Sequence, residues 1–286
     1  MGVNMDGIIL VNKPSGISSH DLVLRARRAL NEKKIGHTGT LDPLAEGLML
    51  LTCGKATKVL PFLTHHSKEY ICKMQLGYKT DTLDVTGQIT ERKEIIPVNE
   101  EQVKNVLNSF LGSSKQIPPM YSAKKVNGVH LYNLARENKE IEREAIDINI
   151  YEIELLELSD DTITFRALCS TGTYIRSLVN DIAEKLENLA TMTYLKRTKT
   201  DKFSLEEASS IDDLFNGKYR LISTYELLDN YRYIELKDPT RIYQGKRLKL
   251  DNIEDDIVMI TYDKQVIAAY EKNKEDSLYY SKRGLW

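Results

Sequence analysis

The chain has 286 residues, of which 41% are hydrophobic and 29% charged, as in an ordinary globular protein of one or two domains. Its formal net charge of −2 argues mildly against a nucleic-acid-binding domain, because such domains are often strongly basic. No stretch approaches the ~18 apolar residues of a membrane helix, and the first residues do not resemble a secretory signal, so we expect a cytoplasmic protein. Cys53, Cys72 and Cys169 form no CxxC pair, which predicts buried free thiols and no metal site.

Basic residues gather in two segments of this nearly neutral chain. Residues 20–58 hold seven lysines and arginines against four acidic residues, and residues 115–143 hold six against three. Such segments are compatible with a basic face on a nearly neutral protein, but the charge data alone do not decide the matter.

The first predicted elements are short strands and one amphipathic helix. Residues 7–11 form an apolar run that predicts a buried strand, and residues 12–16 are turn formers. Ser18 or Ser19 can cap a helix to about residue 30, whose apolar positions have helical spacing. A glycine-punctuated loop over 35–43, a strand over 47–52 and a helix over 55–63 follow.

The middle of the chain alternates strands and helices without a regular βαβ repeat. Residues 70–78 predict a strand with alternate residues buried, and 79–88 are polar and rich in turns. Asn99 caps a helix to about 111, the long segment 117–138 is irregular, and strands are expected over 145–158 and 162–169. A helix opened by Thr173 and a strand over 193–199 complete this part.

This order of elements predicts an α+β fold with a mostly antiparallel mixed sheet flanked by helices. After residue 228 the pattern changes to short β-like runs at 232–236, 257–262 and 266–270. We therefore expect a large domain over 1–225 and a small all-β module over 228–286.

The most informative segment is G-H-T-G-T-L-D-P-L-A-E-G, residues 36–47. Gly36 and Gly39 allow tight backbone and close approach of a ligand, and Pro43 keeps Asp42 out of the α region. Loops of this kind often present catalytic groups, but a structural turn with Asp42 as a capping residue has the same shape.

The segment resembles the active-site motif G-H-T-G-x-L-D-P-x-A-x-G of the TruB family of pseudouridine synthases. Further matches occur in the same order, and the resemblance covers about residues 6–210. They are N-K-P-S-G at 12–16, K-E-Y at 68–70, Q-I-P-P-M-Y-S-A at 116–123, G-T-Y-I-R at 172–176 and L-K-R at 195–197. Residues 243–248 are more weakly similar to a PUA module. Ala183 and Asp201 depart from the family, which commonly has glycine at both places.

The resemblance implies a pseudouridine synthase domain, an RNA-gripping insertion over about 115–143, and a PUA-like module. It implies that Asp42 is the catalytic carboxylate, that Arg176 is its partner, and that Tyr70 stacks on the flipped uracil. Substrate-binding residues on the same grounds are His37, Tyr174, Leu195, Lys13, Lys124, Lys125 and Arg136.

The implied activity is conversion of the T-loop uridine at position 55 of tRNA to pseudouridine by a monomer. The T-arm is the partner, and no cofactor is expected because the isomerisation is redox-neutral. Three alternatives stay open. They are a non-catalytic tRNA-binding protein, a glycoside hydrolase using Asp42 and Glu46, and a guide-RNA-dependent relative.

Overall fold

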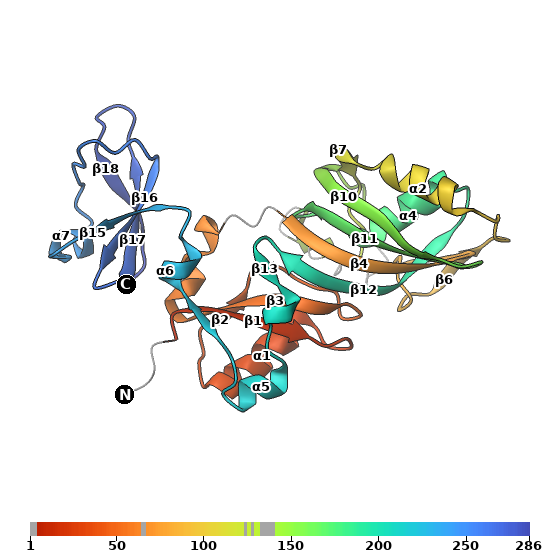
Figure 1. Cartoon of the computed structure of the whole chain (residues 1–286), viewed down its shortest axis with the longest axis horizontal. Helices are drawn as coiled ribbons and strands as arrows, with labels where there is room; N and C mark the ends of the chain where they lie inside the picture. Colours follow the sequence, from red (N-terminus) through yellow and green to blue (C-terminus); the bar gives the residue numbers. More distant parts are fainter. Residues whose placement is uncertain (1–4, 64–66, 123–124, 127–128, 132–140) are drawn as a thin grey trace.

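The computed structural model describes residues 5–63, 67–122, 125–126, 129–131 and 141–286, with one large sheet, one small sheet and flanking helices (Figure 1). The large sheet has ten strands and the small sheet four. Apart from two parallel pairs, neighbouring strands run antiparallel, which confirms the predicted α+β class with a mostly antiparallel sheet.

The first half of the large sheet is buried on both faces. Ile9 and Val11 of its central strand face the main core, whereas Ile8 and Leu10 face a second core on the other side. This double burial explains why the strand has a continuous apolar run instead of an alternating pattern. The strands are β1 (Gly7–Lys13), β2 (Ile35–His37), β3 (Glu46–Cys53) and β14 (Leu221–Ser223).

Helix α1 (Ser19–Leu30) lies against this half and begins as the sequence predicts. Ser18 is its N-cap and forms a capping box with Asp21, which satisfies backbone N–H groups of the first turn. Helix α5 (Ile211–Phe215) packs beside α1.

The second half of the large sheet is antiparallel and covered by two helices. Alternate residues of its strand β4 are buried, including Tyr70 and Cys72, as predicted. Helix α2 packs on β10, and helix α4 packs on β4 and β12. These elements are β4 (Ser67–Leu76), β7 (Gly112–Gln116), β10 (Ile146–Leu158), β11 (Thr162–Ser170), β12 (Ala190–Thr200), β13 (Phe203–Ser204), α2 (Glu100–Asn108) and α4 (Ile175–Lys185).

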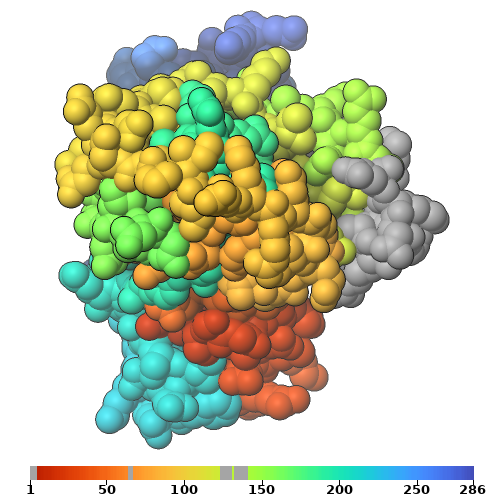
Figure 2. Space-filling view, turned by 90° about the vertical axis from the view of Figure 1, so that its right-hand side faces the viewer, coloured from red at the N-terminus to blue at the C-terminus, as the bar shows by residue number. Residues whose placement is uncertain are grey.

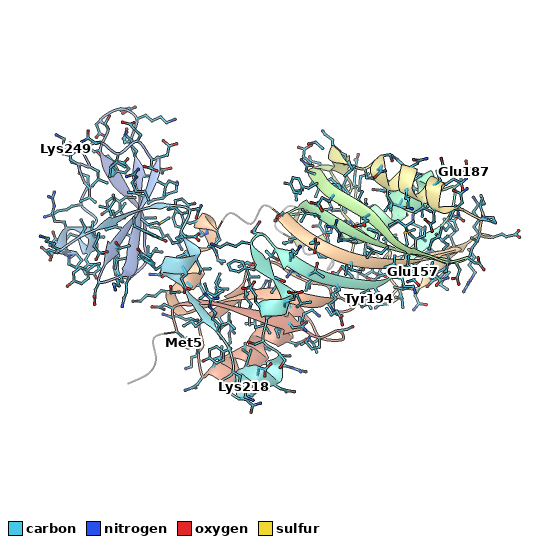
Figure 3. All side chains as sticks on the ribbon, in the orientation of Figure 1. Met5, Glu157, Glu187, Tyr194, Lys218 and Lys249 are labelled. Carbon is cyan, nitrogen blue, oxygen red and sulfur yellow. The ribbon has the colours of Figure 1, made fainter. Side chains whose placement is uncertain are left out.

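The two halves meet where β3 and β12 run parallel over only two residue pairs, Glu46 with Lys196 and Gly47 with Arg197. Gly47 has φ +110°, and a Cβ atom there would lie 2.3 Å from the carbonyl oxygen of Arg197. Only glycine allows this close approach. The hydroxyl of Tyr194, labelled in Figure 3, donates to Glu46 Oε1 at 2.7 Å and reinforces the seam.

The small sheet has its own core and also packs on the large one. Tyr270 and Tyr279 are fully buried inside it. Met259, on its other face, lies in the second core together with Ile8 and Leu10. Its elements, with a preceding helix, are α6 (Thr224–Leu227), β15 (Arg232–Glu235), α7 (Thr240–Tyr243), β16 (Ile257–Tyr262), β17 (Gln265–Lys272) and β18 (Tyr279–Gly284).

Two expectations for residues 35–63 were wrong in detail. The expected loop begins with strand β2, which pairs with β3. The helix expected over 55–63 is instead a pair of 3-10 turns, Gly54–Lys58 and Leu60–Phe62. Pro61 explains the second difference, because it lacks an N–H and disfavours α geometry at the residue before it.

The remaining elements are short. Figure 2 shows the end of the molecule away from the small sheet, where the segment after β4, in orange and yellow, forms much of the surface. These elements are β5 (Tyr78–Thr80), β6 (Ile89–Arg92), β8 (Lys125–Val126), β9 (Val129–His130) and a 3-10 turn at Leu205–Glu207. None of the helices in the described ranges has the length and apolar character to cross a membrane.

All three cysteines are free and buried, as predicted. Burial raises the pKa of each thiol, to about 12 for Cys53 and about 11 for Cys169. The thiols are therefore protonated and apolar in character at neutral pH.

Candidate active site

A pocket of about 390 Å³ opens between the two halves of the large sheet. The loop between β2 and β3 forms one wall, and β4, β12 and the start of α4 form the other. Five of the residues that the sequence singled out line it together: Asp42, Tyr70, Tyr174, Arg176 and Leu195.

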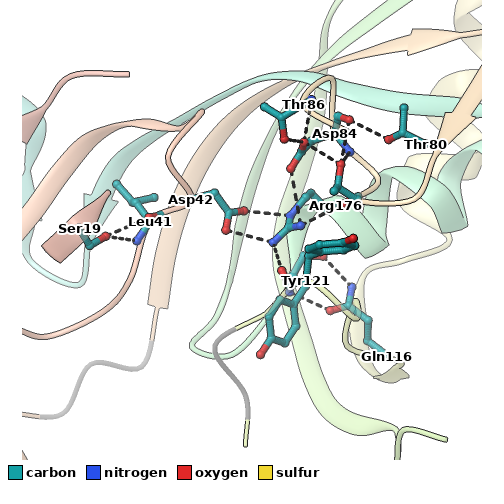
Figure 4. Close-up of polar contacts among 11 residues, drawn as sticks. Ser19, Leu41, Asp42, Thr80, Asp84, Thr86, Gln116, Tyr121 and Arg176 are labelled. Carbon is teal, nitrogen blue, oxygen red and sulfur yellow. Dashed lines mark hydrogen bonds and ion pairs between the residues drawn. The ribbon is translucent and has the colours of Figure 1, made fainter. Parts of the chain in front are cut away.

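The loop that carries Asp42 is fixed to the residues around it by backbone hydrogen bonds. Ser19 Oγ accepts from the Leu41 N–H at 2.8 Å and donates to the Leu41 carbonyl at 2.9 Å (Figure 4). The Gly16 N–H donates to the Pro43 carbonyl at 2.8 Å. These contacts hold the backbone on both sides of Asp42 and so fix the direction of its side chain.

Arg176 grips the carboxylate of Asp42 with two nitrogens. Its Nη2 donates to Oδ1 at 3.0 Å, and its Nε lies 2.9 Å from Oδ2. This planar, bidentate geometry is the strongest form of arginine–carboxylate pair. The side chain of Arg176 is 5% exposed and that of Asp42 33%, so the carboxylate faces the pocket while the guanidinium lies behind it.

The guanidinium of Arg176 also has hydrogen-bond and ion-pair partners on the side away from Asp42. Nη1 donates to the Thr82 carbonyl at 3.0 Å and lies 3.6 Å from Asp84 Oδ2, and Nη2 donates to the Tyr121 carbonyl at 2.7 Å. Asp84 is in turn held by hydroxyl and backbone donors of Thr82 and Thr86. Arg176 therefore lies in a fixed orientation between the buried carboxylate of Asp84 and the pocket-facing carboxylate of Asp42 (Figure 4).

The charges around Asp42 act in opposite directions on its pKa. Burial raises the pKa above the ordinary range, Arg176 counteracts this rise, and the negative charge of Asp84 adds to it. Without Arg176 the carboxylate would therefore be harder to ionise.

Tyr70 and Leu195 form the apolar wall of the pocket. They are 6% and 5% exposed, and their strands β4 and β12 are paired side by side. Burial raises the pKa of Tyr70, so its phenol stays protonated at neutral pH. Tyr174 precedes α4, and the side chain of Gln116 holds its backbone N–H and carbonyl at 2.8 and 3.1 Å.

Lys13 and His37 lie near the pocket but are not among the residues that line it. Lys13 is fully buried, and its ammonium donates to the carbonyls of Ile17, Pro14 and Pro43 at 2.8, 3.0 and 3.4 Å. Through the bond to Pro43, Lys13 supports the loop that carries Asp42. His37 is half-buried at the end of β2, and burial together with nearby cations lowers the pKa of its imidazole.

Three expected phosphate-binding residues cannot be placed in the same way. Lys124 and Arg136 lie outside the described residues, and only the backbone of Lys125, in β8, is described.

Sequence reasoning assigned no role to three further groups in this region: Lys68, Asp84 and Arg197. Arg197 is 1% exposed, and its guanidinium donates to the Leu48, Gly39 and Thr40 carbonyls at 2.7, 3.3 and 3.5 Å. Lys68 lines the pocket. Strand alternation could have pointed to Lys68 and Arg197, because alternate residues of a strand share a face. Lys68 lies two residues from Tyr70, and Arg197 lies two residues from Leu195. Asp84 lies in a polar turn and gave no such signal.

Glu46 does not face Asp42 across the pocket. It accepts from Tyr194 and lies 3.6 Å from the ammonium of Lys196 on β12. This arrangement disfavours the pairing of carboxylates that a glycoside hydrolase needs.

The chain is similar to proteins of one family over most of its length. A family model described as "TruB family pseudouridylate synthase (N terminal domain)" matches residues 27–175. A Clostridium tetani protein named tRNA pseudouridine synthase B is 42% identical over 282 residues, covering 95% of this chain and 97% of that protein. An Oceanobacillus iheyensis protein of the same name is 40% identical, with 94% and 93% covered.

Solved structures share the fold. A chain from an H/ACA RNP bound to a substrate RNA containing 2'-deoxyuridine aligns with a TM-score of 0.71 at 22% identity, covering 99% of this chain and 86% of that one. A chain from a Cbf5-Nop10-Gar1 complex aligns with a TM-score of 0.70 at 24% identity and the same coverage. Together with the family model and the close relatives, these matches establish that the chain belongs to the TruB family of pseudouridylate synthases.

Proposed function

We propose that this protein converts a uridine of tRNA to pseudouridine, with Asp42 as its catalytic carboxylate. The observation that carries the proposal is the bidentate pairing of Asp42 with a buried Arg176 at a pocket walled by Tyr70. The relatives named tRNA pseudouridine synthase B supply the substrate class.

The reaction breaks the N1–C1′ bond, turns the base and joins C1′ to C5. The C5 proton is lost and N1 gains one, so the isomerisation consumes nothing and needs no redox cofactor. An ionised carboxylate beside the bound nucleotide supplies the nucleophile or base that bond cleavage requires. Arg176 favours that ionised form and aims it into the pocket.

The remaining site residues have supporting roles. A uridine must leave its stack to reach the pocket, where Tyr70 offers an aromatic face and Leu195 an apolar wall to the base. Tyr174 adjoins the same space, and His37, in the segment that leads into the loop, contacts displaced bases. Lys13 acts through the loop that it supports, and Lys124, Lys125 and Arg136 bind phosphates of the T-arm.

The target we propose is the T-loop uridine at position 55, modified without a guide RNA. The catalytic domain spans residues 1–225 with its RNA-gripping insertion at about 115–143, and residues 228–286 form a PUA-like RNA-binding module. The enzyme works as a monomer in the cytoplasm, without a protein partner. A light-scattering mass of one chain, 32.8 kDa, is the expected result for the oligomeric state.

The decisive experiment is tritium release from unmodified tRNA carrying [5-³H]uridine, with no guide RNA added. Wild type should release tritium, and Asp42→Asn should release none while binding tRNA within about tenfold, roughly 1.4 kcal/mol. Asp160→Asn, at an exposed turn far from the pocket, is the matched control and should behave as wild type.

The position is tested with the same assay on tRNA carrying cytidine at position 55. Tritium release should disappear with this substrate. Persistent release would move the target to another uridine, and absence of release from every tRNA would overturn the proposed activity.

A further inference from the structure

Lys68 and Tyr70 lie on the same face of β4, and both line the pocket. Two residues along a strand place them ~6.7 Å apart. The intervening Glu69 points to the opposite face, where it pairs with Arg166 and Lys199 at 3.0 and 3.4 Å. Strand geometry therefore directs the ammonium of Lys68 to the same space as the ring of Tyr70.

The ammonium packs directly against the loop that carries Asp42. A Cβ atom built on Gly39 would lie 2.8 Å from Lys68 Nζ. Gly39 itself also lines the pocket. The missing side chain at Gly39 thus leaves the room that the ammonium occupies, between strand β4 and the loop.

Among the residues that the structure describes, none pairs with the ammonium of Lys68. Within the described ranges its ammonium forms no hydrogen bond and no ion pair, although Asp201 and Cys169 influence it at longer range. Burial first, and then the neighbouring Arg197, lower the pKa of Lys68 to about 8. The surroundings therefore disfavour a charge that a bound anion would stabilise.

Arg197 is less available to a bound anion than Lys68. Its guanidinium already donates to three backbone carbonyls, including those of Gly39 and Thr40 in the loop. Arg176 is likewise occupied by Asp42, Thr82 and Tyr121. Lys68 is thus the cation lining this pocket, as far as the structure describes it, whose donors remain available to a ligand.

We propose that Lys68 binds a phosphate that flanks the target uridine and so positions the flipped nucleotide over Tyr70 and Asp42. The inference rests on the proposed function, since RNA supplies the anion. A base against Tyr70 places its ribose near Asp42 and directs the sugar–phosphate backbone along β4 towards Lys68. Lys68 is a positioning residue in this scheme, because it touches the backbone and not the reacting bonds.

The first test is the salt dependence of binding to a T-arm stem-loop RNA, measured by fluorescence anisotropy. Replacing Lys68 with Met removes the charge and keeps the length of the side chain. Lys68→Met should weaken binding about tenfold and reduce the slope of log K against log salt by about 0.7 to 0.9. Lys73→Met is the matched control, because Lys73 lies on the opposite face of the same strand.

The second test locates the phosphate with RNAs that carry one neutral methylphosphonate, placed 5′ or 3′ of the target uridine. One of the two substitutions should weaken wild-type binding about tenfold and weaken Lys68→Met binding less than twofold. Equal sensitivity of both proteins to both RNAs would overturn the proposal. Lys68→Gln provides a second neutral variant if thermal melting shows that the Met variant does not fold.

These measurements are independent of turnover. If wild type binds RNA but releases no tritium, the proposed activity fails while the anisotropy results still decide the role of Lys68. If Lys68→Met matches wild type in slope and in methylphosphonate sensitivity, the role of Lys68 fails while the Asp42→Asn result stands.

Discussion

At the scale of single residues, the charge state of Asp42 depends on a balance between burial and the charged side chains around it. Burial and Asp84 raise its pKa, and Arg176 opposes both. Lys13, beneath the loop, also lowers the pKa of Asp42. The contact with Arg176 therefore favours the carboxylate anion of Asp42, which attack on a sugar or a base requires.

Replacing Arg176 with Lys should show how strongly Arg176 lowers the pKa of Asp42. Lysine cannot make the bidentate contact, so the pKa of Asp42 rises further and the acid limb of the kcat–pH profile moves to higher pH. Turnover at pH 7 should also fall, by about 100-fold. Tritium release measured from pH 5 to 9 tests both effects.

Arg166→Lys is the control, because Arg166 pairs with Glu69 and Glu152 on the face of the sheet away from the pocket. Its profile should follow wild type. An acid limb that does not move in Arg176→Lys would show that Arg176 does not control the ionisation of Asp42.

The sequence predicted a role for five of the residues that line the pocket, because the motif around Asp42 and the G-T-Y-I-R segment are short and specific. It did not predict Asp84, whose role depends on a turn that packs behind Arg176 only in the folded chain. Asp201 shows the opposite case. It occupies a place where the family commonly has glycine, and its φ of +49° explains that preference. Aspartate tolerates this backbone, so the departure is accommodated.

At the scale of elements, the site depends on the narrow seam between β3 and β12. Asp42 comes from one half of the large sheet, whereas Tyr70, Leu195 and Arg176 come from the other. Only two residue pairs join the halves in parallel at this point. A change at the seam should therefore alter both stability and the alignment of the site.

Gly47→Ala tests the seam. The new methyl group would meet the Arg197 carbonyl oxygen at 2.3 Å, and φ of +110° is strained for alanine, so we expect a loss of at least about 2 kcal/mol in unfolding free energy. Chemical denaturation measures it. Gly112→Ala is a matched control, since its φ is +88° but nothing lies within 4 Å. Equal losses in the two variants would attribute the effect to backbone strain alone.

Sequence patterns predicted the long elements well and the short ones less well. Helix α1 has a capping box and β4 alternates, and both begin within three residues of the expected place. Strand β2 was missed because three residues containing a glycine give no periodic signal. The parallel contact of β3 with β12 was also not predictable, because it depends on a close approach between residues 150 positions apart in the chain.

The next prediction concerns the RNA-gripping insertion at about residues 115–143. Neutralising Lys124 and Lys125 together should weaken tRNA binding and reduce its salt slope by about 2, one for each lost phosphate contact. Binding measured between 50 and 200 mM salt gives the slope. Lys104→Gln with Lys93→Gln, at two exposed lysines that do not line the pocket, serves as a charge-matched control. An unchanged slope would remove Lys124 and Lys125 from the interface.

At the scale of the whole molecule, the small sheet is part of the packing of the large one. Met259 is fully buried in the core that it shares with β1 and β3. The outer face of these strands would otherwise expose Ile8, Leu10, Leu48 and Leu50 to water. The two sheets should consequently unfold together.

Met259→Ala tests this coupling. The cavity should lower the free energy of unfolding by about 2 to 5 kcal/mol. The single tryptophan, Trp286, reports on the small sheet, and tritium release after heating reports on the large one. Both midpoints should fall together, whereas Tyr262→Ala, exposed on the same strand, should move neither. Separate shifts of the two probes would show that the modules unfold independently.

The burial of Cys53, Cys72 and Cys169 has a practical consequence for spectroscopy. Their raised pKa values leave almost no thiolate to react with maleimides at neutral pH. A cysteine introduced on the surface of the native enzyme would therefore be labelled selectively, with all three natural thiols left in place. Fluorophore pairs attached in this way, one on each half of the large sheet, would report the distance across the seam while RNA binds.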